Sequence, residues 1–322
     1  MTLDPEVATL LPALDRGFPR VERMSGHEAR AAIRSRLPAD PNPIAVDRVI
    51  DRTIPGPDGE LPVRIYWPAD APTTPAVIVF AHGGGFVFCD LDSHDDLCRS
   101  MANGVGAVVM SVGYRRAPEH PWPAAALDVR AATEWVAAHA EQIGVDVTRL
   151  VLAGDSAGGN LAAVTAIMLR DDHGPAVRAQ ALFYPVIAAD FTTESYRRFA
   201  EGYYNTEAAM RWYWDQYVPL ATDRTHPHAS PGHAQLAGLP PTVLVTAGFD
   251  PLASEGHAYA QALADAGVTA LHRDHPGAIH GFMTMPSLSI CGRARAQAWA
   301  DIRDLADGRP SDVPAARSTS TA

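Results

Sequence analysis

Gly154-Asp155-Ser156-Ala157-Gly158 stands between two apolar runs and predicts the architecture around it. The run before it, Leu150 to Ala153, is typical of a buried strand, and the alanine-rich run Leu161 to Leu169 is typical of a buried helix. A strand that turns abruptly into a helix brings its backbone close on both sides of the turn, so the positions two before and two after the serine exclude a Cβ. The two glycines meet this demand. The stretch therefore predicts a G-x-S-x-G nucleophile elbow with Ser156 at its tip.

Composition narrows the class of protein. The chain has 322 residues, of which 47% are hydrophobic, enough for one large α/β domain or two modest ones. A formal net charge of −11 without any basic block argues against a nucleic-acid or anionic-membrane partner. The sequence contains no lysine, so all 26 basic residues are arginine, which excludes Walker-A phosphate binding and Schiff-base chemistry.

The cysteines and the first residues bear on the compartment. Three cysteines, an odd number without a C-x-x-C pair, suit free thiols in a reducing compartment better than a disulfide framework. The first 14 residues include Asp4 and Glu6 and lack the pattern of a signal peptide, and no apolar run is long enough for a membrane span. We therefore expect a cytoplasmic protein without a membrane span.

Strand and helix signals alternate after an appended, helical segment at residues 1–45. A strong turn cluster at 55–59 joins two strand-like runs and predicts a hairpin. Alternating apolar strands and helices then predict a mostly parallel sheet covered on both faces. The predicted strands are 46–53, 61–67, 76–81, 107–112, 150–153, 180–184, 242–247 and 268–272, and the predicted helices include 94–103, 124–140 and 255–266.

The stretch between Pro185 and Leu239 breaks this rhythm, because it lacks strand signals and is rich in aromatic residues. An insertion of this length after a strand of an α/β sheet commonly folds over the strand ends, where ligands bind. The alternative is that its rings pack a small core of their own. The final stretch, 308–322, is rich in Pro, Ser, Thr and Ala, and we expect it to be disordered.

A serine nucleophile needs a histidine to take its proton and a carboxylate to orient that histidine. In sheets of this kind the order along the chain is serine, acid, histidine, with the last two in loops after later strands. Asp250 follows the strand 242–247, and His280 follows the strand predicted to end near His272, between Gly277 and Gly281. We therefore assign Asp250 as the acid and His280 as the base.

Each assignment has an alternative. Asp250 precedes Pro251 and could serve as the N-cap of the following helix with the proline at its first position. His275 is a competing base close to the same strand end. A further group, His226, His228 and His233, suggests a metal, but it stands in a proline-containing loop without a patterned Cys or carboxylate, so we expect a solvated loop and no metal.

An oxyanion needs hydrogen-bond donors aimed at the point where its charge develops. His82-Gly83-Gly84-Gly85-Phe86 directly follows the apolar strand 76–81, and backbone without side chains approaches a substrate closely. We predict an oxyanion hole made by the N–H groups of Gly83, Gly84 and Ala157. A phosphate loop is excluded because no G-x-G-x-x-G pattern or lysine follows.

With these residues in place, the chain resembles the hormone-sensitive-lipase-like esterases of the α/β-hydrolase superfamily. Five motifs carry the resemblance in the family's order, namely His82 to Phe86, Tyr114 to Ala125, Gly154 to Asn160, Asp250-Pro251-Leu252 and His280-Gly281-Phe282. The sequence departs from the family pattern at Arg116, where leucine is usual, and at Ser254, where an acidic residue is common. Glu119 and Asp128 are interpreted as structural anchors of the loop near the site.

The resemblance implies an α/β-hydrolase fold with an eight-stranded, mostly parallel sheet, helices on both faces and a helical cap. It divides the chain into cap (1–45 and 188–238), core (46–187 and 239–307) and tail (308–322). It further implies a serine carboxylesterase that cleaves short- to medium-chain esters of small molecules without a cofactor, using Ser156, Asp250 and His280. An amidase or acyltransferase with the same triad, a non-catalytic receptor and a homodimer remain alternatives; receptors that resemble this family lack the triad histidine, which this chain has.

Overall fold

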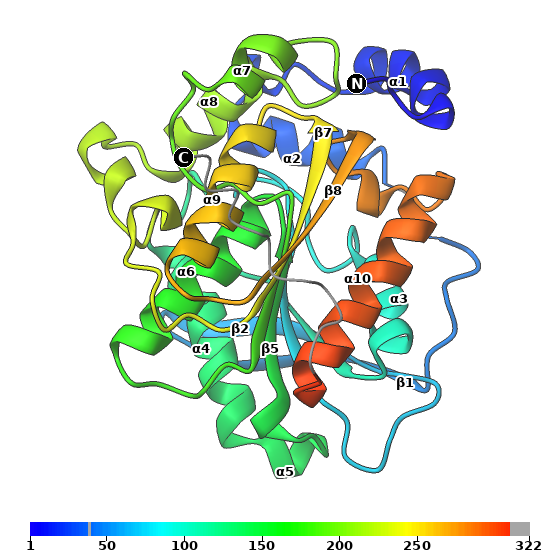
Figure 1. The fold of residues 1–322 in the computed structure, drawn as a ribbon, viewed down its shortest axis with the longest axis vertical. Coiled ribbons are helices and arrows are strands. Elements are labelled where there is room, and N and C mark those ends of the chain that lie inside the picture. Colours follow the sequence, from blue (N-terminus) through cyan, green and yellow to red (C-terminus); the bar gives the residue numbers. More distant parts are fainter. Residues whose placement is uncertain (38–39, 310–322) are drawn as a thin grey trace, which may run out of the picture.

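A single eight-stranded sheet forms the centre of the molecule, as the sequence predicts (Figure 1). The computed structural model describes residues 1–37 and 40–309. The strands are β1 (Arg48–Gly56), β2 (Gly59–Trp67), β3 (Val77–Ala81), β4 (Val108–Val112), β5 (Leu150–Asp155), β6 (Ala179–Phe183), β7 (Thr242–Phe249) and β8 (Ala270–Ile279). Their order across the sheet is β1-β2-β4-β3-β5-β6-β7-β8, and all pairs from β4 to β8 are parallel.

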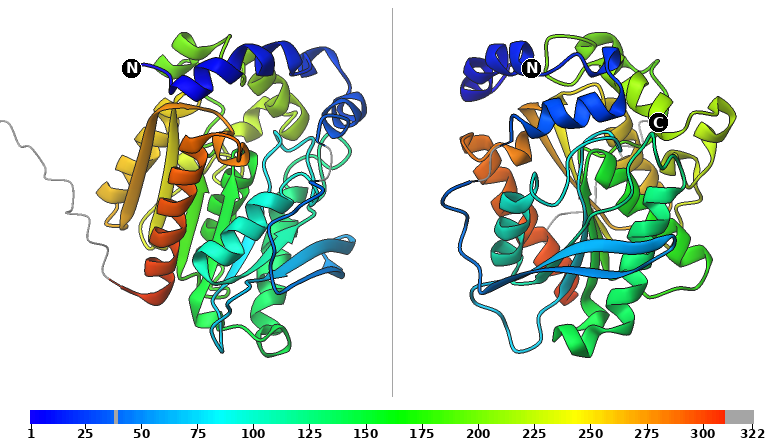
Figure 2. Two further views of the ribbon diagram at one scale, coloured as in Figure 1. Left: turned by 90° about the vertical axis from the view of Figure 1, so that its right-hand side faces the viewer. Right: turned by 180° about the vertical axis from the view of Figure 1, so that it is seen from behind.

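Helices cover both faces of this sheet, which explains why its central strands are apolar throughout. The helices are α1 (Pro5–Gly17), α2 (Gly26–Arg34), α3 (Asp95–Val105), α4 (Ala124–Ala138), α5 (Ala140–Ile143), α6 (Ala157–Asp171), α7 (Glu194–Phe199), α8 (Glu207–Tyr217), α9 (Ala253–Asp265) and α10 (Ser289–Asp307). Helices α4, α6 and α9 lie on one face of the sheet, and helices α3 and α10 lie on the other (Figures 1 and 2). Every residue of β3, β4, β5 and β6 is buried, because neither side of these strands meets water.

The predicted hairpin is confirmed. Strands β1 and β2 pair antiparallel from Arg48 opposite Trp67 to Gly56 opposite Gly59, so Pro57 and Asp58 alone form the turn. This hairpin joins the rest of the sheet through the antiparallel pair β2–β4. These two pairs are the only antiparallel ones in the described sheet.

Four helices from two distant parts of the chain lie at the carboxyl end of the parallel strands (Figure 1). Helices α1 and α2 come from the N-terminal segment, and α7 and α8 from the stretch between β6 and β7. The two parts touch: the N–H of Tyr204 donates to Asp15 Oδ1 at 2.7 Å, and the rings of Phe18 and Tyr204 meet edge to face at 5.0 Å. The segment from β6 to β7 contains no strand among its described residues.

The last strand is longer than the sequence predicts. Strand β8 continues through Pro276 to Ile279, whereas the apolar pattern ends near His272. Proline is tolerated there because β8 is the edge of the sheet and pairs only with β7, so its missing N–H costs no ladder bond. Close contact with β7 also needs Gly248, since a Cβ at that position would lie 2.4 Å from the Pro276 carbonyl oxygen. His280 therefore follows the strand directly rather than standing in a flexible loop.

Two observations concern the ends and the membrane. Helix α10 ends at Asp307, and the next residue, Gly308, has φ 70°, the left-handed conformation typical of a residue that follows a helix. The predicted disordered tail falls, beyond residue 309, outside the described residues. None of the helices that the structure describes has the length and apolar composition needed to cross a bilayer.

Candidate active site

Ser156 lies at the turn between β5 and α6, at the carboxyl end of the central strand. Its backbone has φ 54° and ψ −118°, a conformation rare for a residue with a side chain. A Cβ at Gly154 would come within 2.2 Å of the Gly158 carbonyl oxygen, and one at Gly158 within 1.9 Å of the Ala81 carbonyl oxygen. Glycine at both positions is therefore a steric requirement, as the motif predicts, and the turn presents the hydroxyl above the sheet.

The structure brings Ser156, His280 and Asp250 into one hydrogen-bonded chain, although 124 residues separate the first two. His280 Nε2 lies 2.9 Å from Ser156 Oγ, and His280 Nδ1 lies 2.6 Å from Asp250 Oδ2. A carboxylate only accepts, so the hydrogen of the neutral ring is on Nδ1, and Nε2 is left to accept from the serine hydroxyl. The three residues are at most 9% exposed, so little water competes for these bonds.

Asp250 uses its second oxygen to hold the backbone that follows. Oδ1 accepts the N–H of Leu252 at 3.0 Å. The alternative that Asp250 is the N-cap of the next helix, with Pro251 at the first position, is wrong: α9 begins at Ala253 with Leu252 as its N-cap. The two carboxylate oxygens of Asp250 thus have different partners: Oδ1 accepts from Leu252, and Oδ2 faces His280.

The competing histidines lie elsewhere. His272 and His275 are both within β8, because that strand is longer than predicted. His272 Nε2 is 2.9 Å from Thr246 Oγ1, and the His275 ring packs beside Phe282. Within the described residues, His280 is the histidine that hydrogen-bonds to Ser156.

One of the three donors predicted for the oxyanion hole, in the glycine loop after β3, already has an acceptor. The N–H of Gly83 donates to Asp155 Oδ1 at 2.8 Å and is buried, so it is not available to an oxyanion. The sequence does not reveal this bond, because Gly83 and Asp155 are 72 residues apart and meet only through the pairing of β3 with β5. The next two glycines turn into left-handed backbone, with φ 113° at Gly84 and 58° at Gly85. Among the described residues, the N–H groups of Gly84, Gly85 and Ala157 have no hydrogen-bond acceptor.

A buried polar network supports this loop from below. His94 Nε2 lies 3.1 Å from Asp155 Oδ1. Burial raises the pKa of Asp155, but the charge of His94 and its hydrogen bond, together with the Gly83 N–H, outweigh that effect and leave the pKa below its ordinary value. Burial and the neighbouring His94 lower the pKa of His82 to about 3, so this ring is neutral, and its Nδ1 lies 2.7 Å from the Gly83 carbonyl oxygen. Tyr114 stacks on His82 and donates to its carbonyl oxygen at 2.7 Å.

The prediction from sequence assigns no contact to Asp155, His94 or Tyr114, although Asp155 and Tyr114 stand in the quoted motifs. The signal available was the aspartate inside the G-x-S-x-G stretch, which lies between the predicted nucleophile and a buried strand. A carboxylate buried at the end of a strand needs a hydrogen-bond donor, and the glycine loop after the adjacent strand supplies one from its backbone.

Glu255 in α9 fixes the segment that passes beside Ser156. Its Oε1 accepts the Ile187 N–H at 2.8 Å, and the preceding Val186 N–H donates to the Ser156 carbonyl oxygen at 3.1 Å. Burial raises the pKa of Glu255 well above its ordinary value, and the nearby Asp250 adds to the rise. The departure from the family pattern at Ser254 has a partner of its own, because Ser254 Oγ is 2.7 Å from Ser195 Oγ in α7.

Aromatic residues of the insertion pack in the interior of the protein and against the glycine loop. Tyr196, Trp214 and Tyr217 are fully buried and form part of the packed interior, as the alternative interpretation has it. Tyr217 also stacks face to face on Phe86, directly after the glycine loop, with centroids 3.7 Å apart. Tyr213 lies so close to the loop that a Cβ at Gly85 would be 2.4 Å from its ring. Helix α8 is thus packed on the loop that borders Ser156.

The predicted anchors Glu119 and Asp128 both pair with arginine. Buried Asp128 accepts the backbone N–H of Arg115 at 2.8 Å and the Nη2 of the same residue at 2.8 Å. Glu119 forms an ion pair with Arg30 of α2, which connects the N-terminal segment to this loop. Arg116, the other departure from the family pattern, donates to the Cys89 carbonyl oxygen at 2.6 Å.

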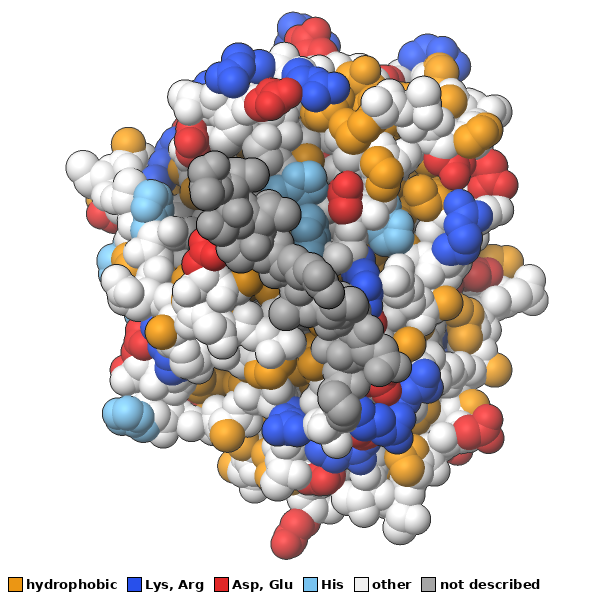
Figure 3. Space-filling model, viewed as in Figure 1, with side chains coloured by type: hydrophobic (Ala, Val, Ile, Leu, Met, Phe, Trp, Pro, Cys, Tyr) orange, Lys and Arg blue, Asp and Glu red, His pale blue; other side chains and the backbone are white. Residues whose placement is uncertain are grey.

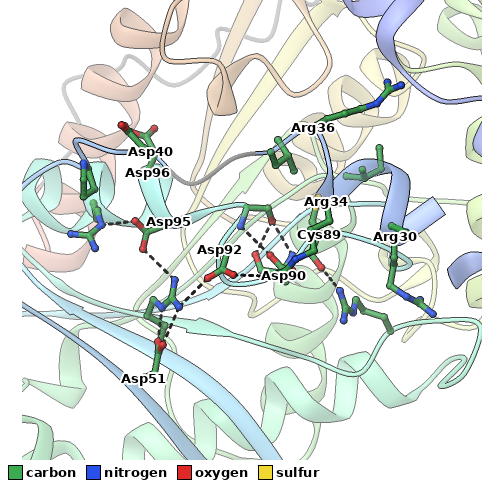
Figure 4. A pocket seen from close by; sticks show the side chains of 18 of the residues that line it. Arg30, Arg34, Arg36, Asp40, Asp51, Cys89, Asp90, Asp92, Asp95 and Asp96 are labelled. Atoms are coloured by element: carbon green, nitrogen blue, oxygen red, sulfur yellow. Dashed lines mark hydrogen bonds and ion pairs between the residues drawn. The ribbon is translucent and has the colours of Figure 1, made fainter. Parts of the chain in front are cut away.

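A charged cavity of about 1020 Å³ lies beside α2 and is lined in part by Cys89 (Figure 4). Its arginines and aspartates neutralise one another: Arg34 lies 2.7 Å from Asp90, and Arg64 lies 3.0 Å from Asp92. Burial raises the pKa of the Cys89 thiol to about 12, so it stays protonated. Ser156 is not among the lining residues, so this cavity is separate from the three residues described above.

Comparisons with known proteins find similarity to α/β hydrolases and to esterases. A family model described as "alpha/beta hydrolase fold" matches residues 78–284. Esterase LipI of Mycobacterium tuberculosis (strain ATCC 25618 / H37Rv) is 42% identical over 272 residues, 81% of this chain and 83% of LipI. Ethyl acetate hydrolase of Pseudomonas putida is 34% identical over 299 residues, 89% of this chain and 94% of that protein. The solved structure of a thermostable esterase from Pseudomonas putida ECU1011 superposes with a TM-score of 0.88 at 37% identity, covering 94% of this chain and 97% of that one.

Proposed function

We propose that this chain, which belongs to the α/β-hydrolase family and is a carboxylic ester hydrolase, cleaves its substrate with Ser156, His280 and Asp250. One observation carries the residue assignment: the unbroken hydrogen-bond chain from Ser156 Oγ through the ring of His280 to Asp250. That chain is what a serine hydroxyl needs to become a nucleophile at neutral pH.

The proposed reaction has two halves. Ser156 Oγ attacks the ester carbonyl carbon while His280 Nε2 takes the hydroxyl proton, and the charged ring is stabilised by Asp250. His280 then gives this proton to the departing alcohol oxygen, which leaves an acyl group on Ser156. Water repeats the sequence on the acyl-enzyme: His280 accepts its proton, the hydroxide adds to the carbonyl carbon, and Ser156 Oγ leaves with the proton returned by His280.

The oxyanion of each tetrahedral intermediate is assigned to three N–H groups, those of Gly84, Gly85 and Ala157. Gly85 replaces Gly83 of the sequence prediction, because the Gly83 N–H is committed to Asp155. The support is the absence of any acceptor for these three groups among the described residues. In addition, Ala157 directly follows Ser156, and the glycine loop is hydrogen-bonded through Gly83 to Asp155, the residue before Ser156.

The residues that shape the substrate site belong to the proposed cap, 1–45 and 188–238. Tyr213 of the cap packs on Gly85, and Tyr204 stands 3.8 Å from the point that a Cβ on Gly281, next to His280, would occupy. Aromatic rings this close to the proposed catalytic residues favour short- to medium-chain acyl groups, and two of the relatives carry the names esterase and ethyl acetate hydrolase.

The direct test is covalent labelling. The wild-type chain is expected to react with a fluorophosphonate at Ser156 and to hydrolyse p-nitrophenyl butyrate, whereas Ser156→Ala loses both, with kcat reduced by about 10⁶-fold. Mass spectrometry identifies the labelled residue. Labelling at another serine, or hydrolysis retained by Ser156→Ala, would refute the assignment.

Amidase, acyltransferase and receptor functions use the same fold and are separated by further readouts. An amidase would hydrolyse the matched p-nitroanilide, and an acyltransferase would give ester products when an alcohol is added. A receptor would bind without turnover, which the intact Ser156–His280 contact at 2.9 Å disfavours. The ester hydrolase proposal requires water to be the preferred acceptor.

We propose two further assignments, on compartment and on oligomeric state. The three cysteines are free, and two of them are buried, which fits a cytoplasmic location.

Strand β8 is an edge of the sheet, so we propose a homodimer through β8 and α10. Multi-angle light scattering distinguishes this dimer from a monomer.

A further inference from the structure

Two imidazoles and one carboxylate converge at a point that the proposed reaction does not use. His257 of α9 and His272 and Asp274 of β8 place their ligand atoms within 4.8 Å of one another. His272 and Asp274 are two residues apart in a strand, so both side chains lie on the same face of the sheet. Helix α9 packs on that face and brings His257 to them. Histidine and acidic side chains gather on the molecular face that carries α9 and β8 (Figure 3).

The three side chains face one another. His257 Nε2 lies 3.2 Å from Asp274 Oδ1, and the rings of His257 and His272 have centroids 4.9 Å apart. Thr246 of β7 stands beside them, with its Oγ1 2.8 Å from Asp274 Oδ1 and 2.9 Å from His272 Nε2. The residue between the two strand ligands points away: Arg273 pairs with Asp301 of α10 at 2.7 Å, on the opposite face. The positive charge of Arg273 is thereby kept out of the cluster.

We propose that His257, His272 and Asp274 bind a divalent transition-metal ion, with Zn²⁺ as the reference ligand. At metal–ligand distances of about 2.0–2.1 Å, tetrahedral coordination places neighbouring ligand atoms about 3.3–3.4 Å apart. The 3.2 Å separation of His257 Nε2 and Asp274 Oδ1 meets that requirement. Rotation of the side chains closes the remaining gaps, and water fills the fourth position.

The donor set selects the class of ion. Two imidazoles favour Zn²⁺, Ni²⁺, Cu²⁺ and Co²⁺ over Mg²⁺ and Ca²⁺, which prefer oxygen ligands. A metal ion binds the neutral form of an imidazole and the ionised form of a carboxylate, so binding is measured near pH 7.5. The hydroxyl of Thr246 is placed to orient the ligands from outside the coordination sphere.

A metal at this point joins the elements that carry the proposed acid and base. Asp250 comes directly after β7, and His280 directly after β8, while α9 follows Asp250. The ion would therefore stabilise this corner of the fold. It lies outside the Ser156–His280–Asp250 chain, so its binding is independent of catalysis, and Ser156→Ala is expected to bind the metal as the wild type does.

The test uses the full chain without an affinity tag, dialysed against EDTA and then against metal-free buffer. Isothermal titration with ZnCl₂ is expected to show one ion per chain. At about one hundred times the dissociation constant, the unfolding temperature is expected to rise by about 4 °C. Co²⁺ added in place of Zn²⁺ is expected to give the visible absorption of a tetrahedral site.

Matched variants locate the site. Asp274→Asn and His257→Ala are each expected to weaken Zn²⁺ binding by at least about tenfold, because loss of even an outer-shell partner of a metal site costs about 10- to 100-fold in affinity. The control is His226→Ala combined with His228→Ala, because these rings also have centroids 4.9 Å apart but form no group with a third ligand within the described part of the chain. The control is expected to bind Zn²⁺ normally.

Three results would overturn the proposal: no saturable Zn²⁺ binding, equal affinity in wild type, Asp274→Asn and His257→Ala, or loss of binding in the control. Unfolding temperatures measured in EDTA show whether a variant is folded. If Asp274→Asn or His257→Ala is not folded, His272→Gln, which keeps a polar group beside Thr246, is tested in its place.

Discussion

Asp155 Oδ1 accepts the N–H of Gly83 at 2.8 Å, so the residue before the proposed nucleophile holds the first glycine of the proposed oxyanion loop. The contact crosses from β5 to β3, which are adjacent parallel strands with Ala81 opposite Gly154. His94, 3.1 Å from the same oxygen, keeps the carboxylate in place. One buried side chain thus sets the distance between the serine and the loop that is proposed to receive the oxyanion.

The first prediction tests this contact. Asp155→Ala removes the acceptor and leaves the Gly83 N–H unpaired, so we expect kcat/KM for p-nitrophenyl butyrate to fall about 100-fold through displacement of the loop. Asp155→Asn is the control, because its amide oxygen still accepts from Gly83, and it is expected to stay within about tenfold of wild type. Unfolding temperatures separate lost positioning from lost folding. If Asp155→Ala is folded and fully active, the carboxylate does not position the loop.

The second prediction concerns the acid. Asp250→Asn presents an N–H group to His280 Nδ1, which favours the imidazole tautomer that carries its hydrogen on Nε2. In that tautomer Nε2 cannot accept the proton of Ser156. We expect kcat to fall about 10⁴-fold. The amide oxygen continues to accept from Leu252, so the unfolding temperature is expected to change by only a few degrees. A loss of activity below tenfold would remove Asp250 from the mechanism.

The third prediction uses the pH dependence of stability. Burial raises the folded-state pKa of Glu255 well above the unfolded value of 4.5. The folded state therefore binds this proton more tightly, and the stability that results is fully present below the unfolded pKa and is lost as pH rises through the folded pKa. Glu255→Gln cannot ionise and keeps the acceptor for Ile187 N–H, so its free energy of unfolding is expected to fall less between pH 5 and 9.

Urea unfolding at pH 5, 7 and 9 measures this difference. Glu194→Gln is the control, because the Glu194 side chain is 67% exposed and is expected to leave the wild-type pH dependence unchanged. Parallel curves for wild type and Glu255→Gln would show that Glu255 ionises normally in the folded protein.

The fourth prediction concerns acyl-chain length. Tyr213→Ala removes a ring that packs on Gly85, which opens space beside the proposed oxyanion loop. Each methylene that enters this space gains about 0.8 kcal/mol, or about fourfold in kcat/KM, so the preferred p-nitrophenyl ester is expected to become longer. A series from two to twelve carbons measures the shift. Trp212→Ala, a half-buried neighbour on α8, is the control and is expected to keep the wild-type profile.

Local patterns predicted most of the elements of the fold. Alternating apolar runs and turn clusters place the hairpin and the central strands within a few residues, since burial of both sheet faces imposes a continuous apolar pattern. The prediction was wrong for the end of β8, because Pro276 and Gly277 are typical of a loop. They are compatible with a strand only at the sheet edge, where the Gly277 carbonyl oxygen also accepts from the N–H of Asp4 at 2.9 Å.

For the site, the sequence alone determined which residue types could act and in which order they stand. A serine between two obligatory glycines, a later aspartate and a last histidine follow from the sterics of the elbow and from the chemistry of a serine nucleophile. Only the tertiary structure decided which hydrogen-bond partner each of the site's atoms has. Gly83 donates to Asp155 because β3 and β5 are adjacent, and His257 meets His272 and Asp274 because α9 packs on β8. Partners distant in the chain are set by strand order and helix packing, which no local pattern encodes.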